Sequence, residues 1–307
     1  MKSIKLLTAL LATVPFAAAC GSADSADDAQ TLTFAAIPSE SSQSLQSSYD
    51  NVIAMLEKET GVNIEFQDAS DYAAVVEGQR AGQIDIASFG PFSYILAKDS
   101  GVPIEPVAAQ ADTDEGLPAY SSLAYVTADS DISSLEDLQG KKVCLVDPSS
   151  TSGYLVPTKG FIDAGMNVEA DIEPVMTGGH DASLLALQDG ACDAAFAHDS
   201  MLTTLNDSGQ LSEDDVKPIW ESDPITEDPV VLNTETVDAE LLEQIGTTFR
   251  EKINKPTLVE EGICESEDDC VLPEETEWGY MPVEDSDFNA IRDICEATQA
   301  EACDSIA

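Results

Sequence analysis

Basic residues are scarce in this 307-residue chain, which has 13 Lys and Arg against 59 Asp and Glu and a formal net charge of −46. A nucleic-acid partner is therefore not expected, because proteins that bind nucleic acids neutralise phosphates with a basic surface. Such an excess of acid is typical of a solvated surface that keeps a protein soluble in salt. Hydrophobic residues make up 43% of the chain, so we expect a folded protein and not a disordered acidic tail.

Motifs for metal binding and nucleophilic catalysis are missing as well. No Cys-x-x-Cys pair or Cys/His spacing indicates zinc, and we expect neither a metal nor a cofactor. A serine and a histidine in one site would invite a hydrolase interpretation, but no Gly-x-Ser-x-Gly elbow is present. We therefore do not expect an enzyme.

Long apolar runs are confined to the N-terminus, MKSIKLLTALLATVPFAAAC. Lys2 and Lys5 precede an apolar stretch too short to span a bilayer, which predicts a signal peptide over residues 1–19. Cys20 follows small residues and begins a polar tether, residues 20–30, a pattern that resembles a bacterial lipobox with Ala17 in place of the usual Leu. We expect lipidated Cys20 to hold an extracytoplasmic domain at the outer face of the cytoplasmic membrane or in the periplasm. The alternative is ordinary cleavage beside an incidental cysteine.

Six cysteines remain after Cys20, an even number that suits an exported protein with disulfides. Fifteen pairings are possible, and sequence alone does not choose among them. Short loops close easily, and the two cysteines that remain lie in apolar runs typical of neighbouring strands. The pairs we predict are Cys144–Cys192, Cys264–Cys270 and Cys295–Cys303.

Strand-like and helix-like segments alternate along the chain. The predicted strands are residues 31–37, 62–68, 84–90, 104–110, 121–127, 141–147, 172–178, 192–198, 216–222 and 230–233. The predicted helices are residues 44–58, 72–82, 91–99, 134–140, about 150–164, 182–190, 200–209 and about 238–254. This alternation predicts an open, mostly parallel α/β sheet flanked by helices.

Roughly 280 residues exceed one comfortable core, so two lobes are expected. Residues 31–122 with about 224–307 would form lobe 1, and about 123–223 lobe 2. Crossings near Leu123–Thr127 and Trp220–Ile225 would make a two-strand hinge. The carboxyl ends of the strands, where open α/β sheets bind ligands, would then face each other across a cleft.

The segment DPSSTSGYLVP, residues 147–157, places Ser150, Thr151 and Ser152 at the start of a helix. Free N–H groups and a positive dipole make a helix N-terminus suitable for an anion, and the hydroxyls add donors. The alternative is a helix cap in a Ser-rich turn. Three other strand ends carry polar groups, namely His180 after two glycines, His198 with Asp199, and Asp228 near the return crossing. A lone histidine is most often structural.

Five runs together resemble the phosphonate/phosphite-type periplasmic binding proteins of ABC transporters over roughly residues 30–230. They are FAAIPSE, ASDYAAVVEGQRAGQIDIASFGPFSY, VDPSSTSGYLVP, TGGHDAS and AHDSM. The resemblance implies a type II periplasmic binding protein, a two-lobed clamshell that binds a small phosphorus oxyanion as a monomer and delivers it to permease and ATPase subunits. The Cys-rich C-terminal part resembles the family weakly.

The resemblance also implies the ligand-binding residues. The serine–threonine run would grip the phosphoryl oxygens and the tyrosines would close lobe 1 over the ligand, whereas Ser39 and Glu40 are weaker candidates. The implied set is Tyr72, Tyr120, Ser150, Thr151, Ser152, His180, Asp199 and Asp228. Glu227 stands where the family usually has Gly.

Two carboxylates beside an anion suggest a protonated ligand or an amine tail. An Asp accepts a hydrogen bond from P–OH, and it can pair with an ammonium group. The same two residues could instead cap neighbouring turns. The motifs contain no Arg clamp, so capture must be local. Phosphate, sulfate, a sulfonate such as taurine and a thiamin-like precursor remain alternative ligands, and a scaffold lipoprotein remains an alternative class.

Overall fold

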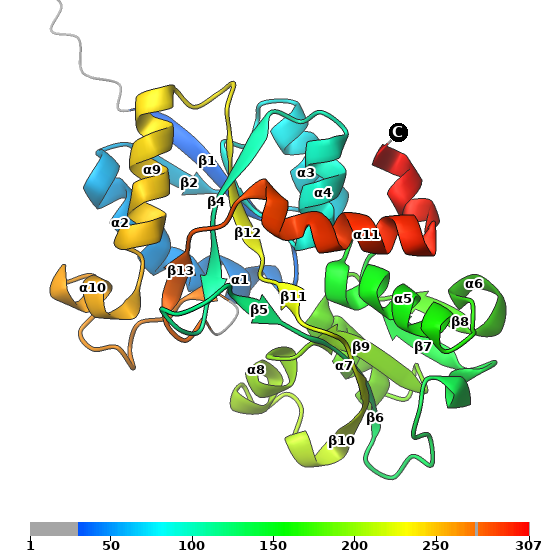
Figure 1. The fold of residues 1–307 in the computed structure, drawn as a ribbon. Helices are drawn as coiled ribbons and strands as arrows, with labels where there is room; N and C mark the ends of the chain where they lie inside the picture. The colour runs from blue at the N-terminus through cyan, green and yellow to red at the C-terminus, as the bar shows by residue number, and fades with distance from the viewer. Residues whose placement is uncertain (1–29, 274–275, 307) are drawn as a thin grey trace, which may run out of the picture.

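The computed structural model describes residues 30–273 and 276–306, which form an α/β fold with two separate sheets (Figure 1). The predicted signal peptide, Cys20 and most of the tether lie outside these residues. Within the described ranges, no helix is both long enough and apolar enough to cross a membrane.

Lobe 1 is built on a six-stranded sheet with the strand order β13-β4-β12-β3-β1-β2. Its strands are β1 (Thr31–Ala36), β2 (Asn63–Phe66), β3 (Ile86–Ser88), β4 (Ile104–Ala111), β12 (Pro229–Asn233) and β13 (Gly279–Met281). Its helices are α1 (Ser42–Ser48), α2 (Asp50–Thr60), α3 (Tyr72–Arg80), α4 (Pro91–Asp99), α9 (Ala239–Glu251), α10 (Lys255–Glu260) and α11 (Asn289–Thr298), with the short turns η5 (Asp285–Phe288) and η6 (Glu301–Ile306). Buried side chains of α2 and α9 pack in one apolar core, and those of α3 and α4 in another.

Lobe 2 is built on a five-stranded sheet with the strand order β10-β6-β9-β7-β8. Its strands are β6 (Ser122–Thr127), β7 (Lys142–Leu145), β8 (Glu173–Met176), β9 (Ala194–His198) and β10 (Val216–Glu221). Its helices and turns are η1 (Glu136–Leu138), the π-helical turn η2 (Thr151–Leu155), α5 (Val156–Asp163), α6 (Val168–Asp171), α7 (His180–Gln188), α8 (Met201–Asp207) and η3 (Glu213–Asp215). Phe161 of α5 belongs to one apolar core, and Leu184 of α7 to another.

The sheets are mixed, which corrects the expectation of mostly parallel sheets. Parallel pairing occurs at one end of each sheet, where β1 pairs with β2 and β3, and β7 pairs with β8 and β9. Strands that carry the chain toward or away from the crossings run antiparallel, as in β4–β12 and β6–β10. The two crossing segments run in opposite directions, so the strands beside them do too.

A two-stranded antiparallel ribbon joins the lobes, as the clamshell prediction requires. It consists of β5 (Ala119–Tyr120) and β11 (Ile225–Thr226). The first crossing comes a few residues earlier than expected, because Ser122 already pairs with His198 inside the lobe 2 sheet. The C-terminal helix α11 packs against both α4 of lobe 1 and α5 of lobe 2 (Figure 1).

Three disulfides cross-link the chain in the pairing chosen from the sequence. They are Cys144–Cys192, Cys264–Cys270 and Cys295–Cys303. The first joins β7 to the segment that leads into β9, two neighbouring strands, and its Cα atoms lie 5.7 Å apart. The other two close short loops in the C-terminal part.

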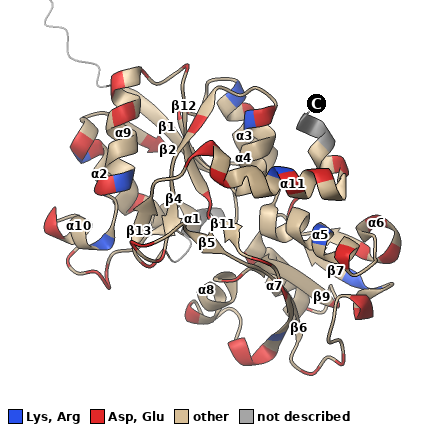
Figure 2. Cartoon of the chain, in the orientation of Figure 1, with Lys and Arg blue, Asp and Glu red and all other residues tan. Residues whose placement is uncertain are grey.

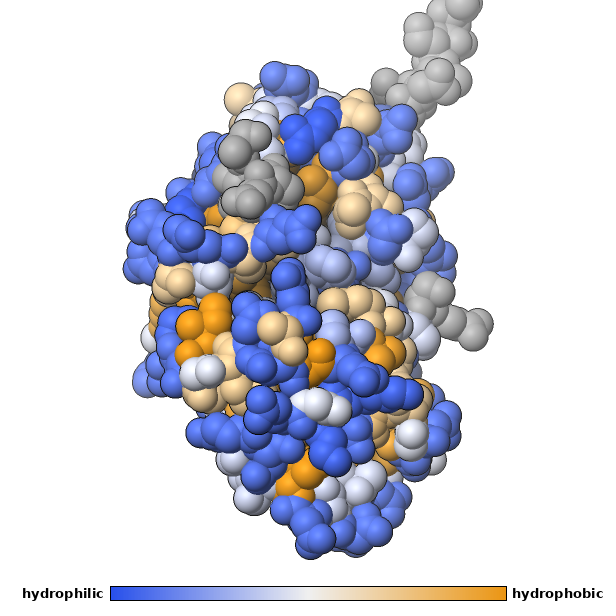
Figure 3. All heavy atoms as spheres, turned by 90° about the vertical axis from the view of Figure 1, so that its right-hand side faces the viewer, coloured by the Kyte–Doolittle hydropathy of each residue, from blue (hydrophilic) through white to orange (hydrophobic). Residues whose placement is uncertain are grey.

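Acidic side chains are spread over the helices and loops of both lobes, whereas basic ones are few (Figure 2). Most of the described basic residues are already neutralised in ion pairs, such as Lys58 with Glu261 and Arg292 with Asp99. The face shown in Figure 3 is mainly hydrophilic, with small, separate apolar spots. The charge excess inferred from the sequence is therefore carried by solvated surface.

Candidate ligand-binding site

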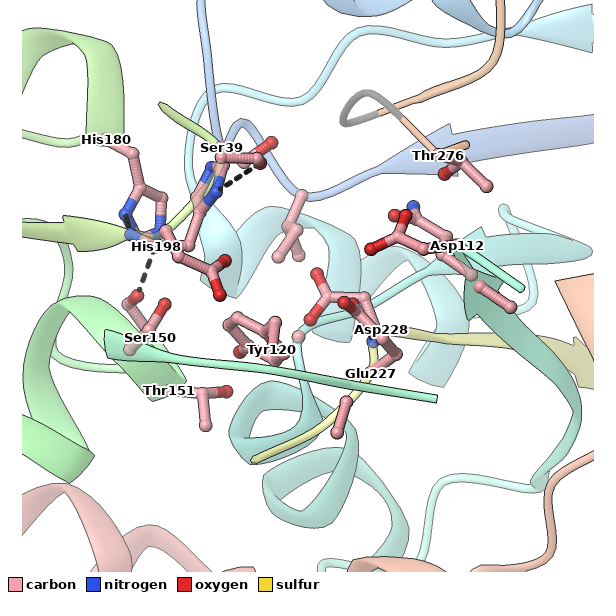
Figure 4. Close-up of a pocket in the computed structure, with 18 of the residues that line it drawn as sticks. Ser39, Asp112, Tyr120, Ser150, Thr151, His180, His198, Glu227, Asp228 and Thr276 are labelled. Carbon is pink, nitrogen blue, oxygen red and sulfur yellow. Dashed lines mark hydrogen bonds between the residues drawn. The ribbon is translucent and has the colours of Figure 1, made fainter. Parts of the chain in front are cut away.

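A cavity of about 330 Å³ lies between the lobes at the hinge ribbon. All eight residues implied by the resemblance line it, although they come from six different elements or loops. They are Tyr72, Tyr120, Ser150, Thr151, Ser152, His180, Asp199 and Asp228. The cavity has a donor end, defined by Ser39, Ser150, His180 and His198, and an acidic end, defined by Asp112, Glu227 and Asp228 (Figure 4).

Ser150 occupies the N-cap of the π-helical turn η2. Its Oγ accepts a hydrogen bond of 3.1 Å from the backbone N–H of Gly153. Gly153 permits this tight turn, because a Cβ there would lie 2.3 Å from the Val146 Cγ2 atom. Ser150 is therefore the member of the Ser-Thr-Ser run that caps this turn. The cap uses its oxygen only as an acceptor, so the O–H hydrogen is left for another partner.

Thr151 and Ser152 extend the hydroxyl wall from the same turn. Thr151 Oγ1 accepts a hydrogen bond of 2.9 Å from the N–H of Phe92, in the first turn of α4 in the other lobe. Thr151 therefore caps a helix across the cleft. A hydroxyl that accepts such a bond keeps its own hydrogen for donation, so both Ser150 and Thr151 can still donate to an anion. Ser152 is buried beside them, and its carbonyl accepts from Ser122 Oγ at 2.6 Å.

Two neutral imidazoles stand next to the hydroxyls. The rings of His180 and His198 lie edge to face with centroids 4.5 Å apart. Burial lowers the pKa of His180 well below its ordinary value, and the neighbouring His198 adds to this effect. Burial also lowers the pKa of His198, to about 4. Both rings are therefore uncharged near neutral pH.

The tautomer of His180 follows from its backbone contact. The N–H of His198 donates to Nδ1 of His180 at 3.2 Å, so Nδ1 is the acceptor and Nε2 carries the proton. Nε2 lies 3.5 Å from Ser150 Oγ, at the donor end of the cavity. His180 is thus built to donate one hydrogen bond into the cavity without carrying a charge.

Three further cavity residues carry buried side-chain atoms without a hydrogen-bond partner among the described residues. They are Ser39 Oγ, Gln110 Nε2 and His198 Nε2. Burying a polar group without a partner costs about 1–3 kcal/mol, so such atoms point to a ligand. Ser39 is a weaker candidate from the sequence and His198 a polar residue at a strand end, whereas no motif in the sequence marks Gln110.

Tyr72 and Tyr120 cover the cavity from lobe 1 and the hinge. Tyr72 is the first residue of α3 and is buried. Burial, followed by the carboxylates of Asp228 and Glu227, raises the pKa of Tyr120, while the hydroxyls of Ser152 and Thr151 act in the opposite direction. Tyr120 is therefore a neutral hydroxyl between the donor end and the acidic end.

Five carboxylates line the cavity, which is more than the sequence indicated. The predicted ones are Asp199 and Asp228, and the others are Asp112, Glu227 and Glu277. Asp199 accepts a hydrogen bond of 2.8 Å from Ser121 N–H, and partial burial raises its pKa. Asp199 therefore both caps a turn and lines the cavity. Asp112 follows β4 directly, so the strand-end rule could have found it, whereas no local signal marks Thr276 or Glu277.

No Lys or Arg lines the cavity within the described residues. Those residues also contain no group of three or more His, Cys, Asp or Glu placed to hold a metal ion. The arrangement can therefore hold an anion by neutral donors at one end and a proton donor or a cation by carboxylates at the other.

Comparison with known families matches residues 34–255 to the phosphonate ABC transporter periplasmic substrate-binding protein model. Among curated proteins, the chain is 41% identical to the phosphate-import protein PhnD of Mycolicibacterium smegmatis, over 97% of each chain. It is 34% identical to the phosphonates-binding periplasmic protein of Escherichia coli, over 66% of this chain and 60% of the relative.

Two solved structures are similar in fold. A binding protein component of an ABC phosphonate transporter from Pseudomonas aeruginosa has a TM-score of 0.77 and 26% identity, over 89% of this chain and 87% of the other. The methylphosphonate complex of PhnD1 from Prochlorococcus marinus has a TM-score of 0.76 and 17% identity, over 88% and 99% of the two chains. These similarities confirm the predicted two-lobed periplasmic-binding-protein fold.

Proposed function

Because this chain belongs to the family of periplasmic substrate-binding proteins of phosphonate ABC transporters, we propose that it captures a phosphorus oxyanion between its lobes and delivers it to the membrane permease. The observation that carries the proposal is the donor end of the cavity. The hydroxyl of Ser150 and the Nε2–H of His180 meet there from η2 and α7, and Ser152 lines the same cavity. Hydrogen bonds to an anion are strong and short, so neutral donors suffice without an Arg clamp.

The carboxylates select which anion fits. A phosphonate, phosphite or phosphate monoanion carries a P–OH group that can donate to Asp228 or Asp199, whereas sulfate and sulfonates are fully ionised near neutral pH and offer no proton. A carboxylate left beside such an anion without a shared proton is repelled by it. The proposal therefore favours phosphorus oxyanions over their sulfur counterparts.

The size of the cavity indicates how large the organic group on the phosphorus of the ligand can be. A volume of about 330 Å³ exceeds what a bare tetrahedral oxyanion needs and falls at the lower end of small-molecule sites, about 300–1,000 Å³. The acidic end would face a short organic tail, and an amine there would pair with Asp112, Glu227 or Asp228. Phosphate is the second candidate, because the Mycolicibacterium relative is named for phosphate import and matches nearly the whole chain.

Several finer features belong to the same proposal. The two lobes, residues 31–122 with about 224–307 and about 123–223, would move as a clamshell on the β5–β11 ribbon. The protein would act as a monomeric lipoprotein anchored through Cys20, working with permease and ATPase subunits outside the cytoplasm. It would bind its ligand without turnover.

A thermal-shift panel tests the proposal. Binding to the folded state raises its stability in proportion to the logarithm of ligand concentration over Kd, so true ligands raise Tm. We expect shifts with phosphite, methylphosphonate, aminoethylphosphonate or phosphate, and none with sulfate. The absence of a shift with every phosphorus oxyanion would refute the proposal. Asp228→Asn should narrow the gap between phosphate and sulfate, because an amide can donate to a fully ionised anion.

A further inference from the structure

The N-terminus of α7 is occupied by the opposite lobe. The backbone N–H of His180 donates to the carbonyl of Ser39 at 2.7 Å, and the N–H of Ser41 donates to Asp181 Oδ2 at 3.1 Å. The segment Pro38–Ser41 follows β1 of lobe 1, whereas His180 and Asp181 begin α7 of lobe 2. These two bonds therefore join lobe 1 directly to lobe 2.

Gly179 lies between the Asp181 carboxylate and the lobe 1 chain. A Cβ at this position would lie 2.7 Å from Asp181 Oδ1 and in ordinary contact with the carbonyl oxygens of Ser39, at 3.4 Å, and Pro38, at 3.7 Å. A side chain at position 179 would therefore displace the Asp181 carboxylate from its place beside lobe 1. The same segment carries Ser39 Oγ into the donor end of the cavity.

We propose that Asp181 is a positioning residue that holds the lobes closed over the ligand from outside the cavity. Asp181 is not among the residues that line the cavity. Its Oδ1 accepts from the N–H of Ala182 at 2.7 Å, which fixes the carboxylate in the first turn of α7. As the cleft closes, its Oδ2 accepts the hydrogen bond from the Ser41 N–H. The inference rests on the proposed function, because closure matters only when a ligand is retained.

In Asp181→Ala, the loss of the negative charge and the loss of the hydrogen bond to Ser41 should have different effects on ligand binding. Removing a negative charge near an anion site should leave binding unchanged or tighten it slightly, because like charges repel. Removing a hydrogen bond specific to the closed state should instead weaken binding about three- to tenfold. The loss should appear in the dissociation rate, since the ligand is released when the lobes open.

The test compares variants of the full chain with methylphosphonate and inorganic phosphate as probes. Asp189→Ala removes the same charge from the far end of α7, where Asp189 is the exposed C-cap residue, and it should bind like wild type. Asp181→Asn keeps an acceptor oxygen and should restore most of the affinity. Ser41→Pro removes the donor from the other lobe at a φ of −59°, which proline accommodates. The two losses should not add in the double variant.

Hydrogen exchange provides a readout that does not depend on affinity. Asp181→Ala should speed exchange of the Ser41 and His180 amides relative to Asp189→Ala, with or without ligand. Asp181→Ala binding as tightly as Asp189→Ala, or a loss confined to the association rate, would overturn the inference. If wild type bound neither probe, the proposed function would fail, and amide exchange would still decide whether Asp181 joins the lobes.

Discussion

The backbone N–H of His198 donates to Nδ1 of His180 at 3.2 Å, and this bond fixes which nitrogen of His180 can donate to a ligand. His180→Ala should weaken binding of a phosphorus oxyanion by roughly ten- to a hundredfold, since bonds to charged groups are worth about 1.5–3 kcal/mol. His180→Gln retains an NH₂ donor and a carbonyl acceptor, so it should lose less affinity. Calorimetric Kd values for the three proteins check this.

His180→Ala and His180→Gln should also differ in their free energy of unfolding. Ala leaves the buried N–H of His198 without its acceptor, which should lower the free energy of unfolding by about 1–3 kcal/mol. Gln can keep that acceptor and should be closer to wild type. An unchanged Kd for His180→Ala would remove the imidazole from the site.

Ser150 and Ser152 should respond differently to truncation. Ser150→Ala removes both the cap of η2 and a cavity donor, so it should cost about 1 kcal/mol of stability as well as affinity. Ser152→Ala removes a cavity hydroxyl that caps no turn, so its unfolding free energy should stay within about 0.5 kcal/mol of wild type while binding falls about tenfold. Urea unfolding and calorimetry on both variants measure this contrast. Equal losses of stability would show that Ser152 is structural.

The sequence located binding residues where polar side chains come directly after a predicted strand. Ser150, His180 and Asp199 were placed by that rule together with the family resemblance, and the structure brings them to one cavity. Tyr72 and Tyr120 came from the resemblance alone, because neither a tyrosine at a helix start nor one in a short strand has a local feature that distinguishes a binding residue from a core residue.

The remaining features depend on packing between distant segments. Thr276 and Glu277 reach the cavity because the C-terminal segment folds back beside β4, where Trp278 N–H donates to Ala111. No periodicity near them indicates this return. The short strand β13 was missed for the same reason, whereas the helix α11 was overlooked although its sequence is clearly amphipathic. The antiparallel strands beside the hinge follow from the direction of the crossings, which hydrophobic alternation does not encode.

Lower pH should destabilise the protein through its buried histidines. His198 has a pKa of about 4 in the folded state against 6.5 when unfolded, so below pH 6.5 the unfolded chain binds the extra proton and folding is disfavoured. At pH 5.5 the titration of His198 lowers the free energy of unfolding by about 1.4 kcal/mol, and His180 acts in the same direction. The raised pKa values of Asp147 and Asp199 act oppositely, because the folded carboxyls bind their protons above the ordinary value of 3.8.

Urea unfolding at pH 7.5, 6.5 and 5.5 measures this slope. Protonation of surface carboxylates relieves repulsion in every variant, so the informative quantity is the difference from His198→Gln. That difference should grow as the pH falls from 7.5 to 5.5. Parallel pH profiles for wild type and variant would show that His198 titrates normally.

Salt should accelerate capture of the anion. The net charge of −46 repels an anionic ligand at long range, and the screening length shortens to about 10 Å at 0.1 M salt. Raising the ionic strength from about 10 mM to 150 mM should therefore increase the association rate several-fold. Stopped-flow measurement of the rate against ionic strength tests this. A rate that falls with salt would mean that the local field at the cleft attracts anions.

The most direct measurement of the central claim is a crystal structure of the protein with methylphosphonate. The account predicts closed lobes, with the phosphoryl oxygens within hydrogen-bond distance of Ser150 Oγ, Ser152 Oγ and His180 Nε2, and with the methyl group toward the acidic end. Phosphorus density at the acidic end, or closed lobes with the donor end filled only by water, would contradict it.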